Sequence, residues 1–147
     1  MKDTLVTVLD KMKNLGAAYA EIRAQKNNNT LINVVDGQIE AVTIARETGA
    51  ALRILAQGAW GFSTTNSLSK EDLEKSAKSA LKMAKAAGKS VREPVKLAKV
   101  KPIEDRVKVR IKKDPKEIDI KTKIDNLLTI NKECLKFDKR IKSVTIR

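Results

Sequence analysis

Hydrophobic positions near the N-terminus recur at helical spacing. Four apolar side chains lie three or four positions apart along the chain: Leu5, Leu9, Met12 and Leu15. This spacing places them on one side of a helix, so residues 3–15 are predicted to be helical. Gly16 follows directly, at the position where glycine commonly ends a helix.

The pattern then changes to alternation between apolar and polar positions over residues 17–65. Short alternating runs are separated by residues that favour turns, namely Asn27–Asn29, Asp36-Gly37, Glu47–Gly49 and Gln57-Gly58. Alternation is typical of half-buried strands, and an Asp-Gly pair between two β-branched runs is typical of a two-residue type I′ hairpin. The sequence therefore predicts an antiparallel meander of about five strands.

The last run of the meander, Gly58–Asn66 (GAWGFSTTN), contains the single tryptophan of the chain. Alternation directs Trp60 and Phe62 to the same face of the predicted strand. The glycines at 58 and 61 permit a tight turn and either a bulge or a close backbone approach. Two interpretations stay open: the aromatic rings fill space beneath the following helix, or the strand lines a binding surface.

A second helix is predicted over residues 68–88. Ser69 and Asp72 have the spacing of a capping box, and Gly88 marks the C-terminal end. Its apolar stripe consists of Leu73, Ala77, Leu81 and Ala84. Small alanine side chains on this stripe allow the helix to lie close to a sheet.

Periodicity is lost over residues 89–106, where Pro94 and Pro102 indicate a linker. Val107, Val109 and Ile111 then alternate with cationic residues, as in a strand. Farther along, a helical pattern and a final strand complete a strand–helix–strand segment over residues 107–147. Its helical positions are Ile120, Ile124, Leu127, Leu128, Cys134 and Leu135.

These elements define an α+β fold class. An antiparallel meander of about five strands is packed by two helices and is followed by a partial strand–helix–strand unit. The predicted organisation is a domain over residues 1–88, a linker over 89–106 and a basic segment over 107–147. The last segment is short for an independent core and is expected to begin a further region.

Charge is distributed unevenly along the 147 residues, which carry a net +13. Residues 1–88 contain 12 Lys and Arg against 9 Asp and Glu, whereas residues 89–147 contain 19 against 9. Such a basic segment either binds an anionic partner or forms a solvated lysine-rich surface. Nucleic acid is not favoured as the partner, because no aromatic side chains are interleaved with the lysines.

The chain contains no histidine and one cysteine, Cys134. A histidine general base, a Ser-His-Asp triad and a His-ligated zinc site are therefore excluded within these residues. Neither catalytic residues, nor a metal site, nor a cofactor is predicted. With no apolar stretch of membrane-spanning length and no signal peptide, a cytoplasmic protein is expected.

Several of these features occur together, in order, in one known family. The YAEIR strand, the DGQIE hairpin, GAALRIL and GAWGFSTTN before a capped helix resemble the N-terminal region of the TldD/PmbA family, also called modulators of DNA gyrase. The resemblance covers residues 15–90 most clearly. Residues 105–147 resemble, with weaker signals, the family's next segment.

The resemblance implies an α+β protein of several hundred residues that works as a homodimer or heterodimer, with zinc metallopeptidases among its members. The family's HExxxH zinc motif has no match in this chain, so no catalytic or metal residue is carried over. The implied role is a wall of a peptide cleft and dimer contacts, with the chain not a protease on its own. The candidate cleft residues are Gly58, Trp60, Gly61, Phe62 and Asn66, and the hairpin turn is Asp36-Gly37.

Two hypotheses about function follow from the resemblance and from the missing zinc motif. In the first, the chain is the N-terminal portion, truncated or separately encoded, of a TldD/PmbA-type metallopeptidase. Its partners would be itself or a catalytic chain of the family, together with an extended peptide, and no membrane. In the second, it is a stand-alone protein-interaction or regulatory module. Nucleic-acid binding through the basic segment is the least supported possibility.

Overall fold

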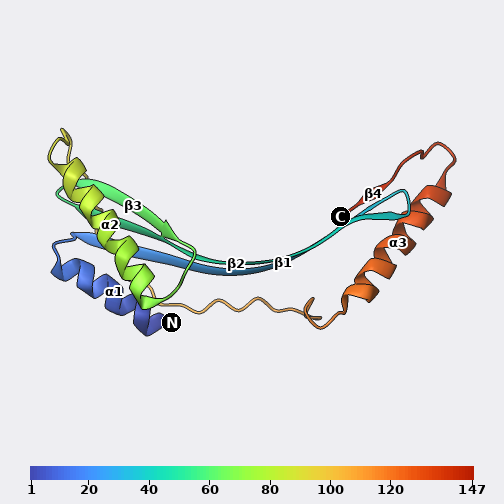
Figure 1. The fold of residues 1–147 in the computed structure, drawn as a ribbon, viewed down its shortest axis with the longest axis horizontal. Coiled ribbons are helices and arrows are strands. Elements are labelled where there is room, and N and C mark those ends of the chain that lie inside the picture. Colours follow the sequence, from blue (N-terminus) through green and yellow to red (C-terminus); the bar gives the residue numbers. More distant parts are fainter. The chain divides into compact units, whose positions relative to one another are not determined.

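A computed structural model describes residues 1–147 and confirms the α+β class. The chain forms three helices and one four-stranded sheet of order β3-β2-β1-β4 (Figure 1). Packing divides it into two compact units, residues 1–27 with 46–100 and residues 28–45 with 101–147. The two long strands β1 (Tyr19–Val35) and β2 (Gln38–Ala56) contribute to both units.

The first unit joins two helices to three strands. Helices α1 (Lys2–Asn14) and α2 (Lys70–Gly88) pack against each other, and α2 lies on β3 (Ala59–Thr65) (Figure 1). Their shared core is formed by small and medium-sized apolar side chains: Val8, Met12, Ala50, Leu52, Ile54, Ala56, Leu73, Ala77, Ala80, Leu81 and Ala84. The predicted alternation is confirmed, because the even-numbered residues of β2 from Ala50 to Ala56 supply the core.

Both ends of α2 contain a residue whose contacts explain its identity. The Ser69 hydroxyl accepts a hydrogen bond from the Asp72 N–H at 3.1 Å and donates one to the Asp72 carboxylate at 2.7 Å. The N-terminal cap predicted from sequence is thus present. At the other end, Gly88 lies against Gln57, where an added Cβ would come within 2.7 Å of the Gln57 carbonyl oxygen.

The second unit contains the Asp36-Gly37 hairpin, α3 (Ile120–Phe137) and the two-residue strand β4 (Thr145–Ile146). β4 pairs antiparallel with Val34 and Val35 at the end of β1. Asn131, on α3, is fully buried and donates a hydrogen bond to the Val144 carbonyl at 2.9 Å. Helix α3 is therefore tied to the chain that leads into β4.

The strand count differs from the sequence prediction. Turns were expected at Asn27–Asn29 and Glu47–Gly49, but β1 and β2 run through both positions without interruption. The meander over residues 17–65 consequently has three strands instead of about five. Pairing of β1 with β2 satisfies the backbone groups of these residues, and this outweighs their local preference for turns.

A further difference concerns the basic segment. Residues 107–111 were expected to form a strand, but residues 101–111 form no helix and no strand. The predicted domain boundaries at residues 88 and 106 stay a prediction. None of the three helices combines the length and apolar character that crossing a membrane requires.

Candidate functional site

The turn between β2 and β3 depends on Gly58. Gln57 and Gly58 have φ angles of 52° and 75°, the left-handed pair that a two-residue type I′ turn needs. Pro94 lies against this turn, so a Cβ on Gly58 would come within 2.6 Å of the Pro94 Cβ. The Val95 N–H donates to the Gly58 carbonyl at 2.9 Å. Gly58 therefore adopts the φ angle that the turn requires and leaves space for Pro94 and Val95 to pack against it.

Gly61 allows α2 to approach the sheet closely. A Cβ at Gly61 would lie 1.8 Å from the carbonyl oxygen of Ala80 and 2.8 Å from the N atom of Ala84. No side chain fits in this space. The close backbone approach, one of the two roles considered for this glycine, is thus the one observed.

Trp60 and Phe62 lie on the opposite face of the sheet from α2. Ala59 and Gly61 are buried beneath the helix, whereas Phe62 is 56% exposed. The interpretation that these rings fill space under the helix is therefore wrong. Contact with the α2 backbone leaves room only for the smallest residues, and alternation sends the rings to the other face, here called the open face.

Trp60 is the centre of a network that spans three strands on the open face. Tyr19 of β1 meets it edge to face, with ring centroids 6.0 Å apart. The Arg53 guanidinium of β2 lies 4.5 Å from the ring centroid, in the geometry of a cation–π contact. Glu21 accepts from Arg53 Nε at 2.7 Å and from the Tyr19 hydroxyl at 2.9 Å. The hydrogen bond to Glu21 raises the pKa of Tyr19.

This network fixes the orientation of the indole ring. Each carboxylate oxygen of Glu21 has one donor, and Arg53 is shared between Glu21 and Trp60. Positioned aromatic and guanidinium groups of this kind are typical anchors of protein-binding surfaces. Sequence alternation placed Tyr19 and Glu21 on one face, but it could not indicate that Arg53 would join them across the strands.

A groove of about 500 Å³ lies at the end of β3. Gly49, which has no side chain, and Ala51 are among the residues that line it. The full lining is Arg23, Gln25, Asn27, Glu47, Thr48, Gly49, Ala50, Ala51, Thr64 and Thr65. Asn66, a candidate from sequence, follows β3 and is exposed but does not line the groove.

The outer edge of β3 is a further feature of this site. β3 pairs with β2 from Ala50↔Thr65 to Ala56↔Ala59 and with no strand on its other side. A two-residue turn closes on a hydrogen-bonded pair, and such pairs alternate along an antiparallel ladder. Trp60, Phe62 and Thr64 therefore direct their backbone N–H and C=O groups outward, beside the rings and the groove.

Asp36 and Gly37, the predicted hairpin turn, belong to the other unit. Their φ angles of 49° and 81° confirm the turn. The Asp36 carboxylate accepts from the Val144 N–H at 2.8 Å and from the Ser143 hydroxyl at 3.1 Å. Asp36 thus fixes the start of β4, a role that turn chemistry alone did not indicate.

The same unit contains a larger groove of about 680 Å³. Ile32, Ile111 and Leu127 contribute its apolar part, and Lys116 and Lys123 are among its charged residues. Lys123 Nζ is held by the Pro115 carbonyl at 2.6 Å. None of the candidate residues from the GAWGFSTTN stretch lies here.

The family resemblance implies zinc in some members, but this chain has no suitable donors for a zinc ion. There is no histidine, and no three Cys, Asp or Glu side chains come together in a group that could hold a metal ion. The single thiol, Cys134, is half-buried and unpaired. The residues of this chain therefore do not fit a catalytic zinc.

Comparison with known proteins points to one family. Residues 20–84 match the family described as PmbA/TldA metallopeptidase domain 1. A metalloprotease of Methanocaldococcus jannaschii is 32% identical over 138 residues, covering 94% of this chain and 30% of the relative. A metalloprotease of Methanothermobacter thermautotrophicus is 31% identical over 100 residues, covering 68% of this chain and 21% of the relative.

Solved structures share the fold at lower identity. TldE from Thermococcus kodakarensis superposes with a TM-score of 0.76 at 16% identity, over 97% of this chain and 32% of that one. A Bacteroides thetaiotaomicron protein described as a modulator of DNA gyrase gives a TM-score of 0.74 at 22% identity, over 98% of this chain and 33% of that one.

The chain spans less than a third of the length of the curated relatives that it matches. Its match to the domain described as the family's first includes the hairpin, the GAWGFSTTN strand and most of α2. The chain belongs to the TldD/PmbA family and carries its N-terminal domain.

Proposed function

We propose that this chain is the peptide-binding N-terminal portion of a TldD/PmbA-type metallopeptidase that acts in the cytoplasm. It supplies one wall of the peptide cleft and contacts to a partner chain, either a second copy or a catalytic chain of the family. Peptide-bond cleavage is assigned to a catalytic chain of the family or to another segment, because the donors of a zinc site are missing from these 147 residues.

The observation that carries the proposal is the coincidence of three features on β3. Its outer edge has no strand partner, Trp60 is held by Tyr19 and Arg53, and Thr64 lines the 500 Å³ groove. An extended peptide added to this edge would bind through its main chain, whatever its sequence. Its alternate side chains would contact the rings and the groove.

Such a mode of binding suits a general peptidase. Main-chain hydrogen bonds do not discriminate between side chains, whereas pockets beside the edge give a mild preference. Most of the residues that line the groove have polar or charged side chains, Arg23 and Glu47 among them. We therefore expect polar peptide side chains at the position beside Thr64 and apolar ones beside Trp60 and Phe62.

The test uses Trp60, the only tryptophan of the chain, as an intrinsic fluorescent reporter. The full chain is titrated with a tryptophan-free extended peptide of about ten residues, the upper length of a typical strand. We expect a saturable change in Trp60 emission. Mass spectrometry of the same mixtures is expected to find only intact peptide, because the chain alone does not cleave it.

Two substitutions at Thr64 separate strand addition from other contacts. Thr64→Pro removes an outward N–H that β2 does not use, a change that edge strands tolerate. Thr64→Ala keeps the N–H and serves as the matched control. We expect Thr64→Pro to weaken binding roughly tenfold or more and Thr64→Ala to leave it nearly unchanged. Equal binding by both variants, or none by the wild type, would refute the proposal.

A further inference from the structure

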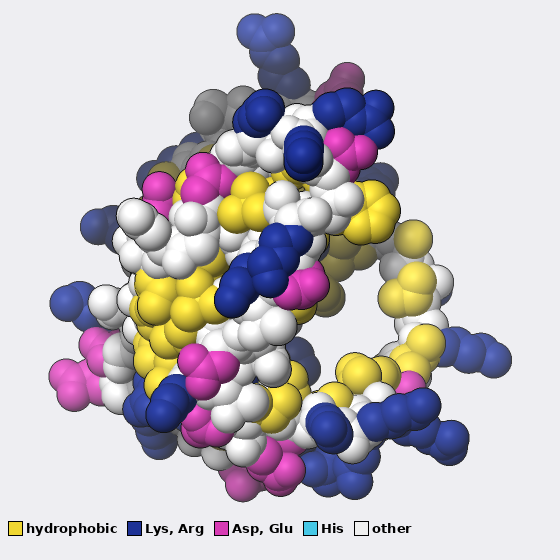
Figure 2. Space-filling view, turned by 90° about the vertical axis from the view of Figure 1, so that its right-hand side faces the viewer, with side chains coloured by type: hydrophobic (Ala, Val, Ile, Leu, Met, Phe, Trp, Pro, Cys, Tyr) yellow, Lys and Arg dark blue, Asp and Glu magenta, His cyan; other side chains and the backbone are white.

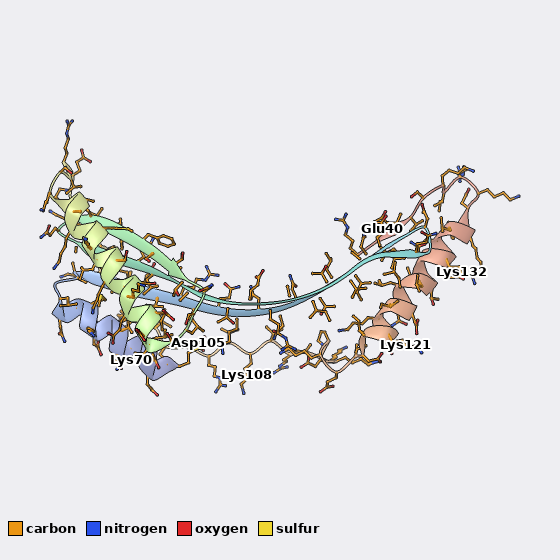
Figure 3. The ribbon with its side chains drawn as sticks, viewed as in Figure 1. Glu40, Lys70, Asp105, Lys108, Lys121 and Lys132 are labelled. Atoms are coloured by element: carbon orange, nitrogen blue, oxygen red, sulfur yellow. The ribbon has the colours of Figure 1, made fainter.

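The segment Arg106–Lys113 (RVKVRIKK) has the pattern of a strand but no strand partner. Val107, Val109 and Ile111 are 85%, 80% and 62% exposed, and the segment belongs to neither a helix nor the sheet. Figure 3 shows Asp105 and Lys108 on an extended stretch of chain, with Lys121 farther on in the first turn of α3.

It is unusual for three β-branched residues at alternating positions, here Val107, Val109 and Ile111, all to be exposed. Val and Ile favour strands because they pack against the surface of a sheet, and contiguous exposed apolar residues commonly mark an interaction site. Figure 2 likewise shows hydrophobic side chains uncovered among Lys and Arg on the face that it draws. The segment therefore has the sequence pattern of a strand, but nothing in this structure pairs with it.

Charge determines which partner fits. Arg106, Lys108, Arg110 and Lys112 alternate with the apolar residues, so in a strand they occupy one face. None of them forms an ion pair with a carboxylate of the chain. Like charges directly opposite each other across two strands are destabilising. A second copy of the same segment is therefore disfavoured as the partner.

The free edge of β2 within the same unit does not match either. β3 pairs with β2 only from Ala50 onward, which leaves residues 38–45 of β2 without a neighbour on that side. This stretch contains a single acidic residue, Glu40. It cannot offer the row of carboxylates that four aligned cations require.

We propose that Arg106–Lys113 is a docking strand for an acidic extended segment of another protein, with Asp or Glu at alternate positions and apolar residues between them. On pairing, the carboxylates lie opposite Arg106, Lys108 and Arg110. The apolar residues of both strands cover Val107, Val109 and Ile111 on the other face. This surface belongs to the unit that does not contain β3, and the proposal does not depend on peptide binding at Trp60.

The probe is a fluorescein-labelled peptide of about ten residues in which Glu and Val alternate, followed by anisotropy with the full chain. We expect saturable binding that weakens as salt is added. The double variant Lys108→Glu/Arg110→Glu is expected to weaken binding roughly tenfold or more. Lys78→Glu/Lys82→Glu, which changes the net charge equally on exposed positions of α2, is the matched control and should bind as the wild type does.

Val109→Pro distinguishes strand pairing from simple attraction between charges. Proline removes a backbone donor and leaves every charge in place, so we expect it to weaken binding as strongly as the charge reversal. Three results would overturn the proposal: no binding by the wild type, unchanged binding by Val109→Pro, or complete displacement of the peptide by duplex DNA. The last would identify the segment as a nucleic-acid contact.

Discussion

At the scale of single residues, Gly61 sets how closely α2 lies on the sheet. The space for a Cβ is occupied by the Ala80 carbonyl, 1.8 Å away. The same contact explains why Trp60 and Phe62 lie on the open face, since alternation places them opposite Gly61. The alternation in β3 could be predicted from the sequence, but the face that α2 covers could not. That face depends on whether the odd-numbered or the even-numbered residues of β3 fit beneath the helix backbone.

Gly61→Ala should therefore be strongly destabilising. Overpacking against a backbone carbonyl that cannot rotate away is expected to lower the free energy of unfolding by roughly 3 kcal/mol. Gly37→Ala is the control, because its Cβ would meet nothing within 4 Å and only the positive φ is unfavourable, at roughly 1–2 kcal/mol. Urea denaturation followed by circular dichroism measures both. A smaller loss for Gly61→Ala than for Gly37→Ala would contradict this account.

At the scale of elements, helix ends were more predictable than strand ends. The Ser69–Asp72 cap is local and was evident from spacing. The ends of β1 and β2 were not, because the Asn27–Asn29 run favours turns locally but lies within a paired strand. Likewise, alternation in residues 107–111 predicted a strand, but a strand also needs a neighbour, and none is present in this structure.

The cap of α2 should respond to acid. Hydrogen bonds from Ser67 and Ser69 lower the pKa of Asp72 below its ordinary value of 3.8. A carboxyl with a lowered folded-state pKa stabilises the fold fully above the ordinary value, and this contribution is lost as pH falls through the lower folded-state pKa. We expect the thermal midpoint to fall on acidification below pH 3.8, and to fall less in Asp72→Asn. Identical acid dependence in the two proteins would exclude Asp72 as a contributor.

At the scale of the whole molecule, the chain belongs to an identifiable family but lacks the donors of a zinc site. Family membership could be inferred from sequence because the hairpin, the GAWGFSTTN strand and the capped helix occur in fixed order. The Trp60 network and the groove beside Thr64 could not be inferred, because Tyr19, Arg53 and Thr64 come from three different strands. Only pairing of those strands brings them to one face.

The central claim is that the outer edge of β3 receives an extended peptide. Amide hydrogen exchange resolved by NMR tests it directly, because successive residues of β3 point in opposite directions. In the free chain, the Phe62 and Thr64 amides should exchange fast, whereas the Gly61 and Ser63 amides, bonded to β2, should exchange slowly.

Saturation with the tryptophan-free peptide should slow exchange at Phe62 and Thr64 by roughly tenfold or more and leave Gly61 and Ser63 unchanged. This alternating protection is specific to strand addition, and it needs no substitution that could disturb folding. Uniform protection of β3, or protection confined to residues elsewhere in the chain, would contradict the account.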